Sequence, residues 1–231
     1  MTDSARKTKL IAFEGIDGSG KTVQISKWQA FLENAGFRTI TKSFPVYESF
    51  FGAEIGNLLA GTKPVTAQNL DPKSMCLWYA LDRWRVFQSF AYSAYDYVLL
   101  NRFSLSNAVY QSIRTLPAER ESFISWVFEL EEVQLGLPSP DLYVVFDSTP
   151  EISAQNISKK GYRNYVGDKP DVYEASAEMM NQVCALYLQI ARKLNNIFVV
   201  NCVEDGGAMK DPDEIFSEVK KRLEELAIIE N

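Results

Sequence analysis

The stretch Gly15-Ile16-Asp17-Gly18-Ser19-Gly20-Lys21-Thr22 decides the fold of this 231-residue chain. It fits the pattern G-x-x-x-x-G-K-[ST], in which glycines let the backbone wrap around phosphate oxygens and point its N–H groups inward. The stretch follows the apolar run Leu10–Phe13 and opens the helical pattern Lys21–Ala35. A strand, a glycine-rich loop and a helix N-terminus form the context in which this motif binds phosphate. We therefore predict a phosphate-binding loop; a glycine-rich turn without a ligand is the alternative interpretation.

Two side chains of the loop indicate a nucleoside triphosphate. Lys21 can reach the β- and γ-phosphates, and the Thr22 hydroxyl can coordinate Mg²⁺. The chain contains neither the N-K-x-D sequence with which GTPases read guanine nor an evident glutamine that would activate water. We therefore expect the phosphoryl group to pass to a small molecule, which needs its own anion-binding side chain and base pocket. The residues assigned to the nucleotide are Gly15, Asp17, Gly18, Ser19, Gly20, Lys21 and Thr22.

Short runs, four of them apolar and one, Thr39–Phe44, β-branched, alternate with helical patterns along the chain. The runs are Leu10–Phe13, Thr39–Phe44, Tyr97–Leu100, Leu142–Phe146 and Ile197–Val200. The helical patterns are Lys21–Ala35, Ala53–Ala60, a helix that Asp71 and Pro72 open, Ser104–Arg114, Ala118–Val133, Pro150–Ser158, Tyr173–Leu194 and Pro212–Ala227. Strands that are apolar on both faces and separated by helices are typical of a parallel sheet covered on both sides. We predict one α/β domain, residues 1–231, with the P-loop NTPase fold: a five-stranded parallel sheet flanked by helices on both faces.

Composition and charge exclude several classes of protein. Apolar residues make up 46% of the chain, which argues against a disordered protein. The absence of histidine excludes Ser-His-Asp catalysis and histidine metal sites. With 24 Lys and Arg against 30 Asp and Glu, the formal charge is −6, which disfavours a general nucleic-acid binder.

The cysteines and the length of the apolar runs bear on location. Cys76, Cys184 and Cys202 show no C-x-x-C spacing, and scattered cysteines of this kind are usually buried thiols. The first apolar run is too short for a signal peptide, and no apolar stretch approaches the ~20 residues that span a membrane. We therefore expect a cytoplasmic protein with no membrane or nucleic-acid partner.

Beyond the phosphate loop, an ordered series of segments resembles the thymidylate kinase family. The segments are Phe13–Thr22, Phe44–Tyr47, Tyr79–Trp84, Asn101–Phe103, Ser106-Asn107, Tyr110-Gln111, Gly136–Leu142 and Asp171–Glu174. No single acceptor segment is decisive, but their order is specific. The resemblance implies a Mg²⁺-dependent kinase that converts ATP and dTMP to ADP and dTDP. It also implies a homodimer, for which the helices around Trp78 and Trp126 offer apolar faces; packing within the domain is the alternative.

Arg102 is the candidate for binding the acceptor phosphate. It follows the buried run Tyr97–Leu100, so we expect it at the carboxyl edge of the sheet, where ligands bind in open α/β folds. An arginine there can clamp a phosphate through two parallel hydrogen bonds. The matching arginine of the resembled family does so; a structural ion pair is the alternative.

Tyr79 and Arg83 are the candidates for binding the base. They are four residues apart and share one helix face. An aromatic ring can stack on a pyrimidine, and a guanidinium can donate to its carbonyl edge. The alternative is a core aromatic residue beside a solvated arginine.

The resemblance implies further roles around the acceptor. Asp17 would accept a hydrogen bond from the sugar 3′-hydroxyl, Asn107 would help to read the base, and Tyr110 would fill the space of a ribose 2′-hydroxyl. The other residues that it places at the acceptor are Phe44, Pro45, Tyr47 and Tyr173. It also implies a cis peptide bond before Pro45. Ordinary helix or loop packing is the alternative for each of these residues.

The segment 157–171 is the candidate lid over ATP. It carries Arg163, whereas the phosphate loop carries no arginine. In the resembled family, lids on chains with such loops supply arginines over the transferred phosphoryl group. We therefore expect Arg163 to act with Lys21 and Arg102 as a catalytic residue that stabilises charge on the equatorial oxygens. An exposed basic loop is the alternative.

Two positions depart from the family's pattern. Val46 stands where many relatives have an arginine for the acceptor phosphate, and Asn101 replaces the acid of an Asp-Arg-Tyr motif. A phosphate with a second pKa near 6 is largely dianionic at pH 7, so it needs no general base. Because an amide lacks the charge of a carboxylate, Asn101 is expected instead to weaken the Mg²⁺ coordination that it shares with Thr22. Two other functions stay open: a kinase for another nucleotide or deoxynucleoside, and a P-loop regulator that binds nucleotides without turnover.

Overall fold

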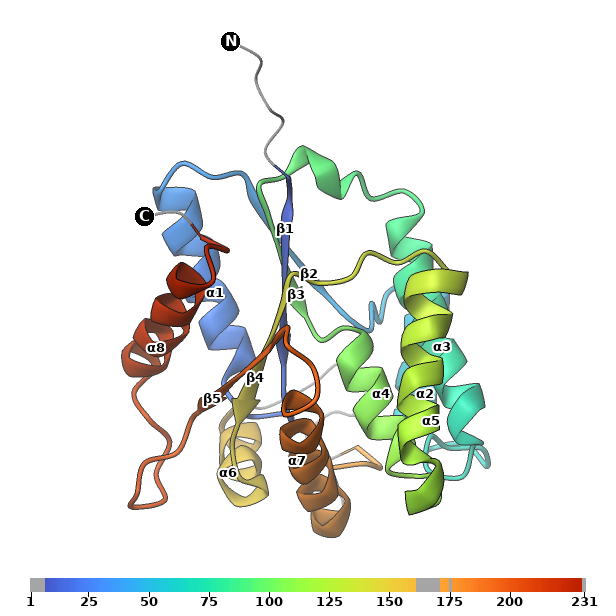
Figure 1. Cartoon of the computed structure of the whole chain (residues 1–231). Coiled ribbons are helices and arrows are strands. Elements are labelled where there is room, and N and C mark those ends of the chain that lie inside the picture. Colours follow the sequence, from blue (N-terminus) through green and yellow to red (C-terminus); the bar gives the residue numbers. More distant parts are fainter. Residues whose placement is uncertain (1–6, 161–170, 175, 230–231) are drawn as a thin grey trace.

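Five strands form one parallel sheet in the computed structural model, which describes residues 7–160, 171–174 and 176–229 (Figure 1). The strands are β1 (Lys9–Glu14), β2 (Thr39–Ser43), β3 (Tyr97–Asn101), β4 (Leu142–Asp147) and β5 (Ile197–Asn201). Their order across the sheet is β2-β3-β1-β4-β5, and all four neighbouring pairs are parallel. The four apolar runs and the β-branched run Thr39–Phe44 therefore form the five strands, and the predicted parallel sheet is confirmed.

Helices cover both faces of the sheet. They are α1 (Lys21–Asn34), α2 (Phe50–Ala60), α3 (Pro72–Phe87), α4 (Ser104–Ser112), α5 (Arg120–Phe128), α6 (Pro150–Lys160), α7 (Ala177–Ala191) and α8 (Pro212–Glu225), with the short segments η1 (Tyr92–Ala94), η2 (Pro117–Glu119) and η3 (Glu129–Gln134). As predicted, Asp71 caps α3 by accepting hydrogen bonds from two backbone N–H groups, and Pro72 is the first residue of the helix. Among the described residues, no helix combines the length and apolar character that crossing a membrane would require.

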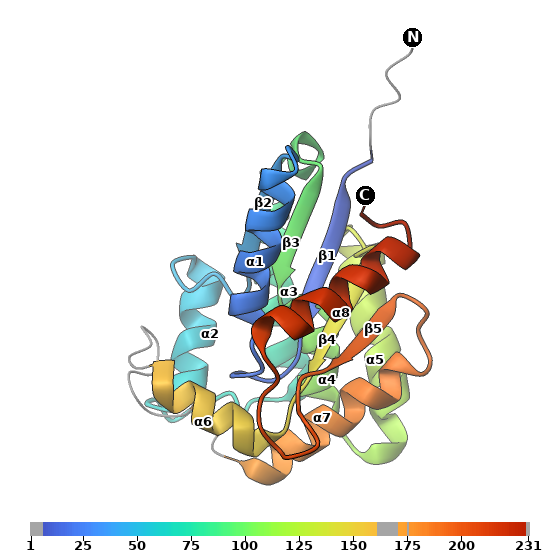
Figure 2. The ribbon, with the colours of Figure 1, turned by 90° about the vertical axis from the view of Figure 1, so that its left-hand side faces the viewer.

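Each central strand contributes side chains to two separate cores. In β1, Leu10 and Ala12 face one core, whereas Ile11 and Phe13 face the other. Successive residues of a strand point to opposite faces, so a strand that is buried on both sides must be apolar throughout. The core on the Ile11 side lies under α1 and α8, which lie side by side in Figure 2, and Trp28 of α1 is completely buried in it.

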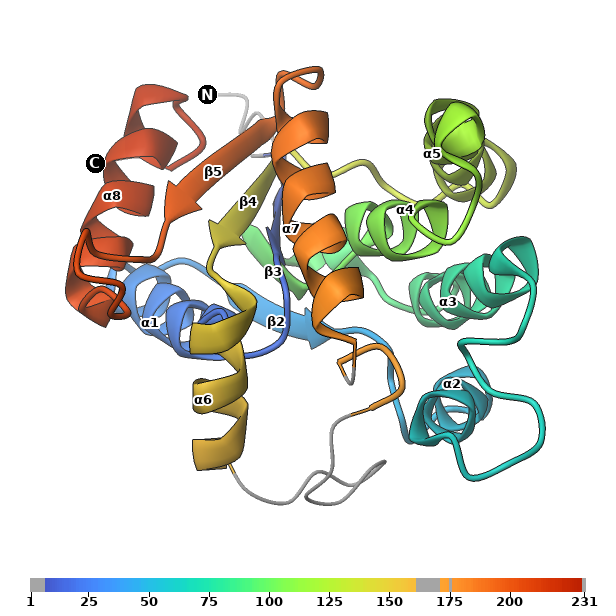
Figure 3. The ribbon, with the colours of Figure 1, turned by 90° about the horizontal axis from the view of Figure 1, so that it is seen from below.

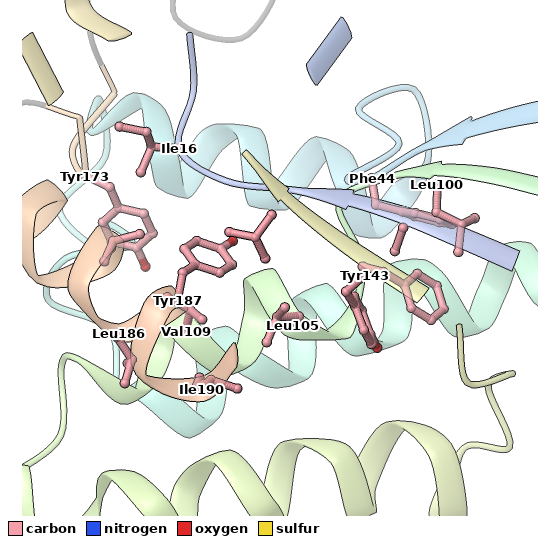
Figure 4. Close-up of a cluster of buried hydrophobic side chains, with 14 of the residues drawn as sticks. Ile16, Phe44, Leu100, Leu105, Val109, Tyr143, Tyr173, Leu186, Tyr187 and Ile190 are labelled. Atoms are coloured by element: carbon pink, nitrogen blue, oxygen red, sulfur yellow. The ribbon is translucent and has the colours of Figure 1, made fainter. Parts of the chain in front are cut away.

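The second core lies between the sheet and α4 and α7. Leu105 and Val109 of α4, Leu186 of α7 and Tyr143 of the sheet all belong to this core (Figure 4). The helices α3 and α5 contact α4 from its far side, so they form an outer layer on this face (Figure 3). This double layer buries α4 on several sides, which makes it a rigid support for polar side chains.

Two helices have other bounds in the structure than the sequence predicts. The helix predicted to begin at Tyr173 begins at Ala177, because Asp171 Oδ1 accepts the backbone N–H groups of Tyr173 and Glu174 and closes a turn. Ser176 then caps α7 by accepting a hydrogen bond from a backbone N–H.

The helix predicted over Ala118–Val133 divides into η2, α5 and η3. The last segment, η3, is a π-helix, in which the N–H of Leu135 donates to the carbonyl of Leu130, five residues earlier, at 2.9 Å. The wider turn brings Glu131 to a completely buried position, where it pairs with Arg83 of α3.

The carboxyl ends of the strands meet at the lower edge of the sheet in Figure 1. The phosphate loop follows β1, Arg102 follows β3, and the segment from Phe44 to Tyr47 follows β2. Parallel strands thus bring these three loops, which are far apart in the sequence, to one place.

Candidate active site

The loop between β1 and α1 can be built only with glycine at its closest approach to α6. Gly18 has a φ of 80°, and a Cβ atom there would lie 2.2 Å from the carbonyl oxygen of Ser153. Asn156 Nδ2 donates to the Gly18 carbonyl at 2.9 Å, so the loop is held against α6. The sequence therefore fixes the loop in a shape that leaves its outer side open to a ligand.

Lys21 lies at the centre of this loop. Its Nζ donates to the carbonyls of Gly15 and Ile16 at 3.0 and 2.7 Å, and it lies 3.9 Å from an oxygen of Asp17. The side chain is only 6% exposed. A buried ammonium at the start of a helix provides positive charge where phosphate oxygens bind.

A cavity of about 370 Å³ opens beside this lysine. The loop residues that line it are Asp17, Gly18, Gly20, Lys21 and Thr22, whereas Gly15 and Ser19 are buried outside its lining. Ser19 Oγ is buried without a hydrogen-bond partner among the described residues. Asn101 also lines the cavity: its Nδ2 donates weakly to Ser43 Oγ at 3.4 Å, and its Oδ1 has no partner within the described part of the chain.

Arg102 lies between this cavity and a second one and lines both. Its Nη2 is 3.0 Å from an Asp17 oxygen, its Nη1 donates to Ser106 Oγ at 2.9 Å, and its guanidinium lies over the Tyr110 ring. Burial alone would lower the pKa of Arg102, but the negative charge of Asp17 and other neighbours raises it well above the ordinary value. The site therefore holds a permanent cation between its two halves.

The backbone of Arg102 is in the left-handed region, with a φ of 63°. This conformation is uncommon for a bulky residue, and it persists only where the surrounding structure holds it. The N–H of Arg102 donates to the Phe13 carbonyl at 3.0 Å, and the next N–H, of Phe103, donates to the buried Glu14 carboxylate at 2.8 Å. Glu14 also accepts a hydrogen bond from Ser106. Burial raises the pKa of Glu14, which the sequence reasoning did not single out.

The second cavity brings together all the residues predicted to bind the acceptor. They are Asp17, Phe44, Pro45, Tyr47, Tyr79, Arg83, Arg102, Asn107, Tyr110 and Tyr173. The Phe44–Pro45 peptide bond is cis, as predicted. Further lining residues, which had been given no role, are Leu59, Ser106, Gln111, Asp171 and Glu174. All but Leu59 belong to segments that carry the family resemblance, but the sequence gave no reason to assign a role to them.

Arg83 is not solvated; it is 2% exposed and forms a two-point ion pair. Its Nε and Nη2 donate to the two carboxylate oxygens of Glu131 at 2.7 and 2.5 Å. Because Arg83 also lines the cavity, Nη1 is the guanidinium nitrogen that can serve a ligand. Asn107, one of the cavity residues, shares the same carboxylate through its Nδ2 at 2.8 Å.

Two amide side chains of α4 present opposite groups to the cavity. Asn107 Nδ2 also donates to the Cys76 carbonyl, and its Oδ1 is buried without a partner among the described residues. Gln111 Oε1 accepts hydrogen bonds from Arg114 and Tyr173, and its Nε2 is the buried atom that lacks a partner within the same residues. Asn107 shares Glu131 with Arg83 and lies one helical turn from Gln111. The residues that line the cavity therefore include a guanidinium, an amide oxygen without a partner on Asn107 and an amide N–H₂ without a partner on Gln111.

Three carboxylates lie together where the two cavities meet. Asp17, Asp171 and Glu174 each place one oxygen within 4.8 Å of the others. Burial, followed by the negative charge of Glu174, raises the pKa of Asp171 to about 7. Carboxylate oxygens in such a group are the ligands that Mg²⁺ prefers. The sequence reasoning placed metal ligands at Thr22 and Asn101 and did not find this cluster, because its members are far apart in the chain.

Of the candidate lid, residues 157–160 form the end of α6, and residue 171 belongs to the turn before α7. Residues 161–170, and with them Arg163, lie outside the described residues.

Comparisons with known proteins agree on one family. The sequence model described as Thymidylate kinase matches residues 13–207. A thymidylate kinase from Mycobacterium tuberculosis is 31% identical over 185 residues, which cover 79% of this chain and 85% of the relative. One from Maridesulfovibrio salexigens is 32% identical over 223 residues, covering 93% and 94%. Among solved structures, a thymidylate kinase from Candida albicans has the same fold, with a TM-score of 0.70, 20% identity and coverage of 96% of this chain and 93% of that one.

Proposed function

This chain belongs to the thymidylate kinase family, and we infer that it transfers the terminal phosphoryl group of ATP to dTMP, forming ADP and dTDP. One observation of the structure carries this proposal. The cavity beside the phosphate loop and the cavity that collects the acceptor residues share Asp17 and Arg102. A donor and an acceptor bound in these two cavities would meet at a lysine and an arginine.

The kinds of hydrogen-bonding groups in the second cavity support thymine as the base. Thymine presents an acceptor, a donor and an acceptor through O4, N3–H and O2. This edge complements Arg83 Nη1, Asn107 Oδ1 and Gln111 Nε2. Cytosine presents an amino group and an unprotonated N3. The Arg83 donor would then face a donor, and the Asn107 acceptor would face an acceptor. A site that binds by buried hydrogen bonds rejects such a ligand strongly.

The remaining acceptor residues are proposed to hold the sugar and the phosphate. Tyr79 stacks on the base, and Asp17 accepts a hydrogen bond from the 3′-hydroxyl. Tyr110 lies under Arg102, with ring and guanidinium 5.2 Å apart, and fills the space of a ribose 2′-hydroxyl. Arg102 donates to the acceptor phosphate. Val46 carries no charge, so Arg102 holds this phosphate without a second arginine at that position.

Phosphoryl transfer needs no proton acceptor on the protein. An oxygen of the dTMP phosphate attacks the terminal phosphorus of ATP, a new P–O bond forms, and the bond to the β-phosphate oxygen breaks with its electron pair leaving on ADP. Lys21 and Arg102 stabilise negative charge on the moving group, and we assign Arg163 of the lid the same role. The P-loop backbone of Gly15, Gly18 and Gly20 would hold the triphosphate in line.

We propose two sets of residues that suit Mg²⁺. Thr22 and Asn101 offer a hydroxyl and an amide oxygen beside Lys21, and the carboxylates of Asp17, Asp171 and Glu174 offer harder ligands beside Arg102. All are oxygen donors of the kind that Mg²⁺ binds. Bound there, the ion would neutralise charge on the phosphates.

Asn101→Asp is expected to lower the Mg²⁺ concentration that gives half-maximal activity. The carboxylate adds negative charge at a proposed ligand position, and a charged ligand binds a divalent cation more tightly than an amide does. The measurement is initial rate against free Mg²⁺ at saturating ATP and dTMP. An unchanged Mg²⁺ dependence would remove Asn101 from the metal site.

The experiment that tests the function is a panel of acceptors. Purified protein is incubated with ATP, Mg²⁺ and dTMP, dUMP, dCMP, dGMP or thymidine, and ADP release and product are measured. We expect the highest kcat/KM with dTMP. A preference for thymidine or another monophosphate would identify a different kinase, and tight ATP binding without product from any acceptor would identify a regulator.

We also propose that the protein is a homodimer that pairs through α2, α3 and α5, which lie along one side of the molecule (Figure 3). Phe50, Leu77 and Val133 are 77%, 40% and 68% exposed, and the half-buried Trp78 and Trp126 belong to the same elements. Large apolar side chains gathered on one side are typical of an interface.

Phe50→Glu is expected to halve the molecular mass in solution, because a buried charge would oppose dimer formation. Light scattering should give twice the 26.2 kDa chain mass for the wild type and the single mass for the variant. The matched control is Leu226→Glu, which changes a 37% exposed leucine beside α8, on the opposite side of the molecule. A monomeric wild type would reject the proposal.

We also propose that the reaction takes place in the cytoplasm.

A further inference from the structure

Glu131 does not line the base pocket, but its carboxylate accepts hydrogen bonds from two residues that do, Arg83 and Asn107. Its side chain is 0% exposed and belongs to the π-helical segment η3. Oε1 accepts hydrogen bonds from Arg83 Nη2 and Asn107 Nδ2, and Oε2 accepts from Arg83 Nε and Ser104 Oγ. Four donors from two other helices therefore converge on one buried carboxylate.

We propose that Glu131 is a positioning residue that sets the base specificity of the site by fixing which groups Asn107 and Arg83 turn toward the cavity. The inference rests on the proposed function, since it concerns the two residues assigned to the base edge. It adds to that assignment a cause for their orientation, located in a residue that never touches the nucleotide.

The orientation of the Asn107 amide follows from its partners. Nδ2 faces the Glu131 carboxylate at 2.8 Å and the Cys76 carbonyl at 3.0 Å, and both of these groups only accept hydrogen bonds. Turning the amide over would place Oδ1 against two oxygen atoms. Oδ1 is therefore held on the other side, buried and without a partner among the described residues, as an acceptor for a ligand's N–H.

The orientation of the Arg83 guanidinium has the same cause. Glu131 binds the edge formed by Nε and Nη2, so the remaining nitrogen, Nη1, is the one that serves the cavity. The carboxylate also neutralises a guanidinium that is completely buried, where an unpaired charge would be strongly destabilising. Glu131 thus orients both a donor, Arg83 Nη1, and an acceptor, Asn107 Oδ1, toward the edge of the base.

The π-helical turn explains how an acid from the outer layer reaches this position. A π-helical hydrogen bond spans one residue more than an α-helical one, which widens the turn, and such segments are frequent at functional sites. The following residue, Glu132, is only half-buried and contacts Ser139 instead. The two neighbouring glutamates of η3 therefore offer a matched pair, one facing the base pocket and one facing away.

The test compares Glu131→Gln with Glu132→Gln. The dissociation constants of dTMP, dCMP and ATP are measured by calorimetry, together with kcat and KM for dTMP. In Glu131→Gln the introduced amide offers one oxygen and one N–H₂ group to four donors, so it no longer holds the Asn107 amide and the Arg83 guanidinium in a single orientation. We expect dTMP to bind roughly ten- to a hundredfold more weakly, dCMP to bind no more weakly than before, and ATP to be unchanged. Glu132→Gln should match the wild type.

A change that is equal for dTMP, dCMP and ATP, or no change, would overturn the inference, because it would leave Glu131 a structural role only. Should Glu131→Gln fail to fold, Ser104→Ala decides the question. That variant removes one neutral hydrogen bond to Glu131, and it should reduce the preference for dTMP over dCMP by a smaller factor; an unaltered preference in the folded variant rejects the proposal. In an Asn107→Ala background the effect of Glu131→Gln on the preference should largely disappear.

The outcome is separable from that of the proposed function. A wild type that phosphorylates no acceptor would refute the function. A wild type that phosphorylates dTMP, with a preference insensitive to Glu131 and Ser104, would refute only the inference.

Discussion

Lys21→Ala is expected to lower kcat for dTDP formation by about two to three orders of magnitude, because it removes a preorganised cation from the charge that develops in the transition state. In the structure, Lys21 Nζ is buried in the loop and contacts the carbonyls of Gly15 and Ile16. Its loss leaves two backbone acceptors without their donor, a cost of about 1–3 kcal/mol each at most, which a protein of this size can tolerate. The fold should therefore persist while activity falls.

The measurement is single-turnover and steady-state product formation, with the thermal midpoint of unfolding as the check on folding. Lys27→Ala is the matched control, since Lys27 lies on the same helix and pairs with Asp213 on the surface. That variant should keep the wild-type rate. A folded Lys21→Ala protein with near-normal kcat would show that the loop is not the phosphate site.

Arg102→Met is expected to reduce kcat/KM for dTMP by roughly a thousandfold or more, since a charge-assisted phosphate clamp and transition-state stabilisation are lost together. The effect is large here because Val46 supplies no second cation, and Arg102 lines both cavities. Methionine keeps an apolar stem of similar length while removing the charged guanidinium that lies over the Tyr110 ring. Arg102→Lys should fall between the two, because an ammonium keeps the charge without the planar fork.

Arg85→Met is the control, since Arg85 lies exposed on α3. The KM for ATP should change less than the KM for dTMP. A variant that raises only the KM for dTMP, with kcat intact, would restrict Arg102 to binding and remove it from catalysis.

The parts of the fold that the sequence predicts are those with a local signal. Unbroken apolar runs predict β1, β3 and β4 because both faces of a central strand are buried. The edge strands are predicted by a β-branched run in β2 and a short apolar run in β5. The phosphate loop is predicted because its glycines and Lys21 are adjacent in the chain. The acceptor residues form one cavity because parallel strands end at one edge of the sheet, so residues such as Phe44 and Arg102 are predictable once the strands are.

The parts that the sequence does not predict depend on contacts between distant residues. Glu14, Glu131 and Asp171 are buried acids, although acids are expected at the surface unless they are paired. Arg83, the ion-pair partner of Glu131, lies 48 residues away, so nothing near Glu131 in the chain indicates its burial. The π-helical turn is hidden for a related reason, because the apolar spacing over Ala118–Val133 is compatible with an uninterrupted α-helix.

The pair of Asp17 and Arg102 makes the two nucleotide sites interdependent. Each side chain lines both cavities, and each is held by the other at 3.0 Å. A phosphate that binds Arg102 from either side would compete with Asp17 for the guanidinium, in the wall that both cavities share. The factor by which bound ATP changes the affinity for dTMP must equal the factor by which bound dTMP changes the affinity for ATP, by thermodynamic necessity. Affinities measured with one nucleotide alone therefore describe a different energetic situation from the ternary complex in which the reaction occurs.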